Sequence, residues 1–276
     1  MSVLEAILIA ILQGVTELFP VSSLGHAVIV PALVGLSLDE KAPEFLPFLV
    51  VLHLGTSVAL LAYFWRSWVG FAASVTGLGA GQKKAEDRRL FFLVCVGTVP
   101  AVILGFALEK FFHHLFSSPV IVSAMLALNG FLLFFGERLK KQAGEKTLVE
   151  LNWRNALLIG AFQCLALIPG FSRSGATITG GILCGLKPDK AAQFSFLLAT
   201  PVIIGAAVVE LPKVYAQRAA FSGTALLAGL VAGVVAYASL VFLMRFFKNH
   251  ETHSLTPFAY YCWGAGALSL VILLAR

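Results

Sequence analysis

The chain has 276 residues, of which 59% belong to the hydrophobic set AVILMFWYC and only 12% are charged. Soluble domains carry about 45–50% apolar residues and about a quarter charged residues, so this composition excludes a soluble globular enzyme. The mean hydropathy of +0.90 agrees with that exclusion. We therefore expect a protein that crosses a membrane several times.

The formal net charge is +6, from 20 Lys and Arg against 14 Asp and Glu. The basic residues lie in short clusters between apolar stretches and form no basic domain, so nucleic acid is not an expected partner. The four cysteines lie inside apolar runs without CxxC spacing, which favours core packing over a disulfide or a zinc site. No Lys or Arg precedes Lys41, so the N-terminus lacks the basic region of a secretory signal peptide and is expected to remain in the mature protein.

The first apolar region, residues 1–37, does not fit a single crossing. One straight helix of that length would extend about 55 Å at about 1.5 Å per residue, well beyond a hydrocarbon core of about 30 Å. Its middle reads QGVTELFPVSSLGH, which places Glu17, Pro20 and two serines where the lipid is deepest. Because proline interrupts helical hydrogen bonding, we predict a broken helix here.

Six further apolar runs, bounded by charged residues, are each long enough to cross a membrane as one helix. They cover residues 45–65, 90–112, 119–136, 191–212, 223–247 and 257–275. In the fifth run, Gly229 and Gly233 have the small-xxx-small spacing that is typical of close helix packing.

Residues 155–186, between the third and fourth runs, repeat the pattern of the N-terminal region. The segment QCLALIPGFSRSGAT places Pro169, Gly170 and Arg173 inside apolar sequence. Backbone outside a helix is costly in hydrocarbon unless protein or a water-filled cavity surrounds it. Both interruptions are therefore expected to face an internal site.

The two interruptions also resemble each other, which indicates an internal duplication. In each, a glutamine is followed by a proline, a serine and a glycine in the same order: Gln13, Pro20, Ser23 and Gly25, then Gln163, Pro169, Ser172 and Gly175. We predict a single integral membrane domain over residues 1–276, with one repeat over about 1–140 and the other over about 150–276. If each repeat is one re-entrant helix-loop-helix hairpin plus three spanning helices, the second repeat is inverted. The predicted fold is thus all-α and polytopic, an inverted-topology repeat with six transmembrane helices and two re-entrant hairpins.

The basic residues give this topology an orientation. Fourteen of the 20 Lys and Arg residues fall on one side, five on the other, and Arg173 lies in the membrane. By the positive-inside rule, the side with fourteen is cytoplasmic and the N-terminus lies outside. The count alone does not prove the hairpins, because a single crossing by residues 155–186 changes it little.

Charged residues at membrane depth are where function is sought, since even mild scales assign about 2.5–3.5 kcal/mol to a charge at the bilayer centre. One interpretation of Arg173 is a structural ion pair with Glu17. The other is an anion clamp, because PGFSRSG combines freed backbone N–H groups, a helix N-terminus and a guanidinium in one place. We favour the clamp, since an ion pair alone does not require these glycines and serines.

The first interruption supplies the groups that phosphoryl chemistry requires beside such a clamp. Ser22 and Ser23 are either helix caps or hydroxyl nucleophiles, and His26 follows within one helical turn. Glu17 lies four residues after Gln13, so both side chains project from one helix face, where a carboxylate can take a proton or bind a cation. His53 either lines the same cavity or bonds to a neighbouring helix.

These two motifs resemble those of the bacitracin-resistance family of undecaprenyl-diphosphate phosphatases. Its first motif is (E/Q)GxxE leading into PxSSxGH, and its second is PGxSRSG; both occur here in the same order. The resemblance covers essentially the whole chain. It implies an inverted repeat with two re-entrant hairpins, and hydrolysis of undecaprenyl diphosphate to undecaprenyl phosphate and phosphate, which recycles the carrier for peptidoglycan synthesis and confers bacitracin resistance.

The resemblance also implies roles for individual residues. The catalytic residues are expected to be Glu17, Ser23, His26 and Arg173. Substrate binding is expected from Gln13, Ser22, Gly25, Gly170, Ser172, Ser174, Gly175 and Thr177. A divalent cation, Mg²⁺ or Ca²⁺, is expected as cofactor, with Glu17 as a ligand and otherwise substrate oxygens and water. Position 13 is Gln where many members have Glu, so a scheme that needs two carboxylates here cannot operate unchanged.

The same family implies a multi-pass protein of the bacterial inner (cytoplasmic) membrane, with the active site facing the periplasm. Its expected partners are undecaprenyl diphosphate and membrane lipid, with bacitracin competing for the substrate. The sequence leaves open whether the chain forms a homodimer, which prenyl chain length it prefers and whether it also flips its product. It also leaves open whether Ser23 or water attacks the phosphate.

Three other functions were weighed. A lipid transporter or flippase shares the architecture of broken helices in inverted repeats and can coexist with hydrolysis. The second membrane lipid phosphatase family is set aside, because the chain has no K-x6-RP stretch and no histidine at the required spacing after Arg173. A nonenzymatic scaffold is disfavoured, because it gives no reason for the free-energy cost of placing Glu17 and Arg173 in the membrane.

Overall fold

The computed structural model describes residues 2–34, 45–77, 81–115, 118–139, 145–216 and 223–275, with side chains at 45–46, 108–115 and 211–216 excluded. The described elements are helical, apart from an isolated bridge between Lys146 and Leu186. In chain order they are α1 (Val3–Thr16), α2 (Ser23–Val34), α3 (Phe45–Tyr63), α4 (Trp65–Val75), α5 (Gln82–Leu115), α6 (Pro119–Arg138), η1 (Leu148–Glu150), α7 (Trp153–Gln163), η2 (Cys164–Leu167), α8 (Arg173–Leu183), α9 (Pro188–Ala216), α10 (Gly223–Asn249) and α11 (Thr256–Leu274).

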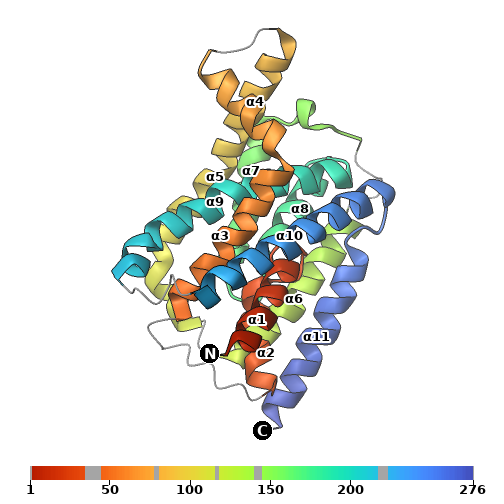
Figure 1. Cartoon of the computed structure of the whole chain (residues 1–276). Coiled ribbons are helices and arrows are strands. Elements are labelled where there is room, and N and C mark those ends of the chain that lie inside the picture. The colour runs from red at the N-terminus through yellow and green to blue at the C-terminus, as the bar shows by residue number, and fades with distance from the viewer. Residues whose placement is uncertain are drawn as a thin grey trace.

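The long helices confirm the predicted crossings. Helices α5, α6, α9, α10 and α11 are each long and apolar enough to span a membrane. The sixth candidate is α3 together with α4, which bend by 77° at Phe64. Figure 1 shows these helices crossing in a bundle, with α4 and the start of α5 at one end and both termini at the other. The chain is therefore a multi-pass membrane protein.

Both predicted helix interruptions are present. Helix α1 ends at Thr16 and α2 begins at Ser23, while α7 ends at Gln163 and α8 begins at Arg173. These four helices have only 11 to 14 residues each, so none reaches the about 20 residues that a crossing requires. Proline in each break removes a backbone donor.

The loops at the basic end of the molecule are tied together. The guanidinium of Arg89, near the start of α5, donates to the carbonyl oxygens of Val149 and Leu151 in the segment that leads into α7. Two of the predicted basic clusters therefore lie at the same end of the bundle. Of the five basic residues assigned to the other side, Lys41, Arg218 and Arg276 and the side chains of Lys110 and Lys213 lie outside the described part of the chain.

Glycine allows the closest helix contacts. A Cβ on Gly55 of α3 would collide with the carbonyl oxygen of Gly229 in α10, and Gly233 also lies against Gly55. The expected close packing at Gly229 and Gly233 is confirmed. Gly97 of α5 and Gly160 of α7 make a second contact of this kind. Small residues here let backbones approach where lipid supplies no hydrophobic driving force.

Substituting Gly55 by alanine is expected to lower the melting temperature of the protein in detergent, because the added methyl overpacks the α3–α10 contact at a cost of about 1–3 kcal/mol. Gly264→Ala on α11 is the matched control, since an added Cβ there meets nothing within 4 Å. We expect that control to melt at or slightly above the wild-type temperature. Equal melting of both variants would contradict the packing argument.

Candidate active site

The two helix interruptions meet at an ion pair. Glu17 follows the end of α1 and Arg173 begins α8, and the Arg173 Nη2 atom lies 2.9 Å from Glu17 Oε1. The two side chains are only 5% and 13% exposed. The ion pair, which the sequence analysis weighed as the alternative to an anion clamp, is thus present, and it joins the two predicted loops in one site.

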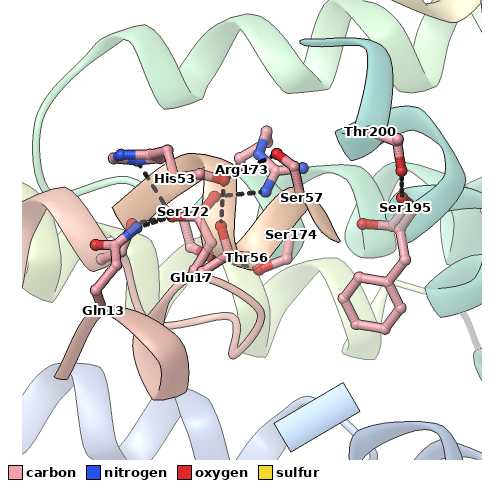
Figure 2. Close-up of polar contacts among 12 residues, drawn as sticks. Gln13, Glu17, His53, Thr56, Ser57, Ser172, Arg173, Ser174, Ser195 and Thr200 are labelled. Atoms are coloured by element: carbon pink, nitrogen blue, oxygen red, sulfur yellow. Dashed lines mark hydrogen bonds and ion pairs between the residues drawn. The ribbon is translucent and has the colours of Figure 1, made fainter. Parts of the chain in front are cut away.

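Glu17 is the centre of a polar cluster, in which Gln13, His53 and Arg173 converge on its carboxylate (Figure 2). Gln13 Nε2 donates to Glu17 Oε2 over 3.0 Å, and the Ser23 hydroxyl donates to the same oxygen over 2.7 Å. A buried carboxylate is stabilised by such donors. The Ser23 hydroxyl thus lies directly against a group that can accept its proton.

His53 of α3 lies on the other side of the carboxylate. Its Nε2 atom is 3.6 Å from Glu17 Oε2, while its Nδ1 atom lies 2.8 Å from the carbonyl oxygen of Leu49. The bond to the carbonyl oxygen requires a proton on Nδ1, and the 3.6 Å distance shows that Nε2 is the nitrogen that faces the carboxylate. Of the two alternatives for His53, the structure supports the cavity-lining one.

His26 is placed differently. Its Nδ1 atom lies 2.7 Å from the carbonyl oxygen of Ser22, and its Nε2 atom lies 2.7 Å from the hydroxyl of Tyr261 on α11. The rings of His26 and Tyr261 stack with centroids 5.7 Å apart. His26 does not line the cavity that contains Glu17 and Arg173. The structure therefore brings His53, and not His26, to the carboxylate.

The serines of the second interruption connect it to the first. Ser172 caps α8 by accepting from the backbone N–H of Gly175 over 3.1 Å. The hydroxyls of Ser172 and Ser174 both donate to the carbonyl oxygen of Phe19, over 3.4 and 3.0 Å. These hydroxyls therefore hold the two loops together.

Local contacts also engage Ser22 and Thr177. The Ser22 hydroxyl accepts from the backbone N–H of Gly25 over 3.1 Å, and Ser22 itself has φ of 69°, in the left-handed region. Thr177 Oγ1 donates to the Arg173 carbonyl oxygen over 2.8 Å and lies 2.6 Å from the Ser195 hydroxyl. Such contacts fix the loop and the first turn of α8.

Two glycines permit the loops to touch. Gly170 has φ of 100°, and a Cβ there would lie 2.5 Å from the carbonyl oxygen of Val122. A Cβ on Gly25 would lie 3.3 Å from Gly170 Cα, so these glycines face each other across the junction. Their places in the motifs are explained by the close approach of the backbones.

Asn129 of α6 was not found by the sequence analysis. Its Nδ2 donates to the carbonyl oxygen of Pro20 over 3.1 Å, and its Oδ1 accepts from the backbone N–H of Ser172 over 3.1 Å. The side chain is fully buried and satisfies one backbone group from each loop. The sequence feature that could have pointed to this residue is a single asparagine inside the apolar run LALNGFLLFF.

A cavity of about 630 Å³ opens beside the ion pair. Its polar lining consists of Glu17, Ser22, Ser23, His53, Gln163, Ser172, Arg173 and Glu210. Its apolar lining includes Leu24, Val28, Leu167, Phe171, Val202 and Ile203. The other predicted binding residues, Gln13, Gly25, Gly170, Ser174, Gly175 and Thr177, support the loops without lining the cavity. A hydroxyl, a carboxylate and a guanidinium in one partly apolar cavity are suited to displacement at a phosphate on a lipid.

The described residues do not form a protein-built cation site. No group of three or more His, Cys, Asp or Glu side chains in them could hold a metal ion. Glu17, the expected ligand, already accepts from Arg173 on one oxygen and from Gln13 and Ser23 on the other. The expected Mg²⁺ or Ca²⁺ stays a prediction.

Comparison with known proteins agrees with this site. A family model described as bacitracin resistance protein BacA matches residues 6–268. An undecaprenyl-diphosphatase of Acidiphilium cryptum (strain JF-5) is 53% identical, covering 99% of both chains. The undecaprenyl-diphosphatase of Granulibacter bethesdensis is 48% identical over 98% of this chain and 97% of its own, and undecaprenyl-diphosphatase 2 of Chromobacterium violaceum is 49% identical over 99% and 100%. The chain belongs to the BacA bacitracin resistance protein family.

Proposed function

We propose that this protein hydrolyses undecaprenyl diphosphate to undecaprenyl phosphate and inorganic phosphate, and so returns the lipid carrier to peptidoglycan synthesis. The observation that carries the proposal is the contact of the Ser23 hydroxyl with the Glu17 carboxylate, beside Arg173 in a cavity with an apolar lining. The relatives named undecaprenyl-diphosphatase, matched over nearly their whole length, support the same substrate. Recycling of the carrier accounts for the resistance to bacitracin, which competes for the diphosphate.

Arg173 and Ser23 define the reaction geometry. Arg173 Nη2 is held by Glu17, but its buried Nη1 has no protein partner among the described residues, so it can donate to a phosphate oxygen. Ser23 Oγ attacks the terminal phosphorus while Glu17 takes its proton. The bond from phosphorus to the bridging oxygen breaks, and undecaprenyl phosphate leaves. Water then cleaves the phosphoserine; in the alternative scheme, water activated by Glu17 attacks directly.

The proposed architecture is an inverted repeat, with α1–α2 and α7–α8 as re-entrant hairpins. Reciprocal packing supports it: α1 lies against α10 as α7 lies against α5, and α3 lies against α10 as α9 lies against α5. The pairs α6 with α8 and α11 with α2 correspond in the same way. Such a repeat brings two helix breaks to the middle of the membrane.

The proposed location is the bacterial cytoplasmic membrane, with the fourteen-residue basic side in the cytoplasm. We also propose that the catalytic cavity faces the periplasm, as the family resemblance implies. The isoprenoid does not require a closed pocket, since burial of about 0.8 kcal/mol per methylene already holds it in the bilayer. A lateral opening between helices therefore gives the substrate access.

Glu17→Gln and Arg173→Lys are each expected to lower phosphate release from undecaprenyl diphosphate by about a hundredfold or more, because each removes a charge or a geometry that the transition state uses. The assay uses purified protein in detergent, and melting curves show whether each variant is folded. A folded variant within a few-fold of the wild-type rate would place the chemistry elsewhere. Folded wild-type protein without release on any prenyl diphosphate would favour lipid transport.

Ser23→Ala is expected to lower the rate by about a thousandfold or more, the scale on which loss of a covalent nucleophile acts. Acid quenching of the wild type during turnover, followed by mass spectrometry, is expected to find phosphate on Ser23. Ser269→Ala, on α11 and outside the cavity, is the matched control. A Ser23→Ala variant that keeps a substantial rate would favour direct attack by water.

The two histidines can be separated by substitution. His53→Gln is expected to lower kcat by at least about tenfold, since the imidazole facing Glu17 assists proton transfer. His26→Gln removes a ring that bonds Ser22 and Tyr261, and is expected mainly to lower the melting temperature. The reverse result, a stable His26 variant without turnover beside an active His53 variant, would return the proton-transfer role to His26.

A further inference from the structure

Gln163 is a buried polar side chain that the chemistry above does not use. It is the last residue of α7, it is 2% exposed, and it lines the same cavity as Arg173. Neither its Oε1 nor its Nε2 atom has a hydrogen-bond partner among the described residues. Burial of an amide without a partner is unfavourable, so its expected partner is a molecule that enters the cavity.

Comparison with Gln13, the corresponding residue of the first interruption, explains why the Gln163 side chain has no hydrogen-bond partner among the described residues. Gln13 Nε2 donates to Glu17, which lies four residues later on the same helix face. Four residues after Gln163 the chain has Leu167, which carries no polar side-chain atom. The same residue type in the corresponding place is therefore satisfied in one half of the protein and free to bind in the other.

A lipid diphosphate presents two phosphates to this cavity, and both need donors. The terminal phosphate must reach Ser23 Oγ, beside Arg173 and its free Nη1. The inner phosphate, bonded to the isoprenoid, must lie toward the apolar lining, which Leu167 and Phe171 supply just after Gln163. Gln163 lines the same cavity and its amide is unpaired among the described residues, so it is available as a donor for that inner phosphate.

We propose that Gln163 binds the inner phosphate of the lipid diphosphate through its Nε2 atom and is a specificity-determining residue for a prenyl diphosphate. This inference rests on the proposed function, because it assigns the second phosphate of that substrate. The same site holds the phosphate of the departing prenyl phosphate, while inorganic phosphate occupies the Arg173 side. Gln163 and Arg173 therefore distinguish the two products.

The test measures product binding without turnover. The apparent affinities of farnesyl phosphate and of inorganic phosphate are obtained from ligand-dependent melting shifts of the purified full chain in detergent. In Gln163→Leu, the affinity for farnesyl phosphate is expected to fall about tenfold, the loss of one hydrogen bond to a charged group, while that for inorganic phosphate changes less than about twofold. Ser269→Ala is expected to change neither affinity.

Gln163→Met, with an unbranched side chain of similar length, is expected to behave like Gln163→Leu. If Gln163→Leu fails to fold, the affinities are measured with Gln163→Met instead. An unchanged farnesyl phosphate affinity, or an equal loss for both ligands, would overturn the assignment. If the wild type releases no phosphate from undecaprenyl diphosphate but Gln163 still affects farnesyl phosphate alone, the phosphatase fails and the subsite stands. If the enzyme is active and Gln163→Leu binds farnesyl phosphate normally, only the subsite fails.

Discussion

The buried contact between Glu17 and Arg173 is the constraint on which the site depends, because two buried charges must each be compensated. The Coulomb attraction of such a pair offsets its desolvation only with good geometry and additional hydrogen bonds. Gln13 and Ser23 supply those bonds to the carboxylate. Since Glu17 and Arg173 come from different helix breaks, the pair forms only where both breaks are held at one place and depth.

The breaks are held by side chains that satisfy exposed backbone. An interrupted helix leaves N–H and C=O groups that hydrocarbon cannot bind. Asn129 hydrogen-bonds one backbone group of each loop, and the hydroxyls of Ser172 and Ser174 donate to the carbonyl oxygen of Phe19. The motif serines therefore contribute to the shape of the site as well as to its chemistry, and their substitution affects both.

The sequence predicted the spans and breaks well, because hydrophobic length and proline position act locally along the chain. The pairing of Glu17 with Arg173 was weighed there only as the alternative to an anion clamp, because the glycines and serines around Arg173 favoured the clamp. The sequence pointed to His26 as the catalytic histidine, whereas the structure places His53 at the carboxylate. The sequence does not show which helix face packs against α11 and which faces the cavity. Asn129 was missed for the same reason: the two loop groups that it bonds are backbone groups 109 and 43 residues away in the sequence.

The proposed duplication explains why the site needs both halves of the chain. Two loops of identical chemistry would place like charges together at the centre of the molecule, which is unfavourable at low dielectric. Here the first loop carries the carboxylate and the hydroxyl, while the second carries the guanidinium, with Leu167 where the first has Glu17. Because the two loops differ at these positions, one carries a cation that donates hydrogen bonds and the other an anion that accepts them, and the two attract each other. Neither half alone provides both a proton acceptor and an anion clamp, so the chemistry arises only at their interface.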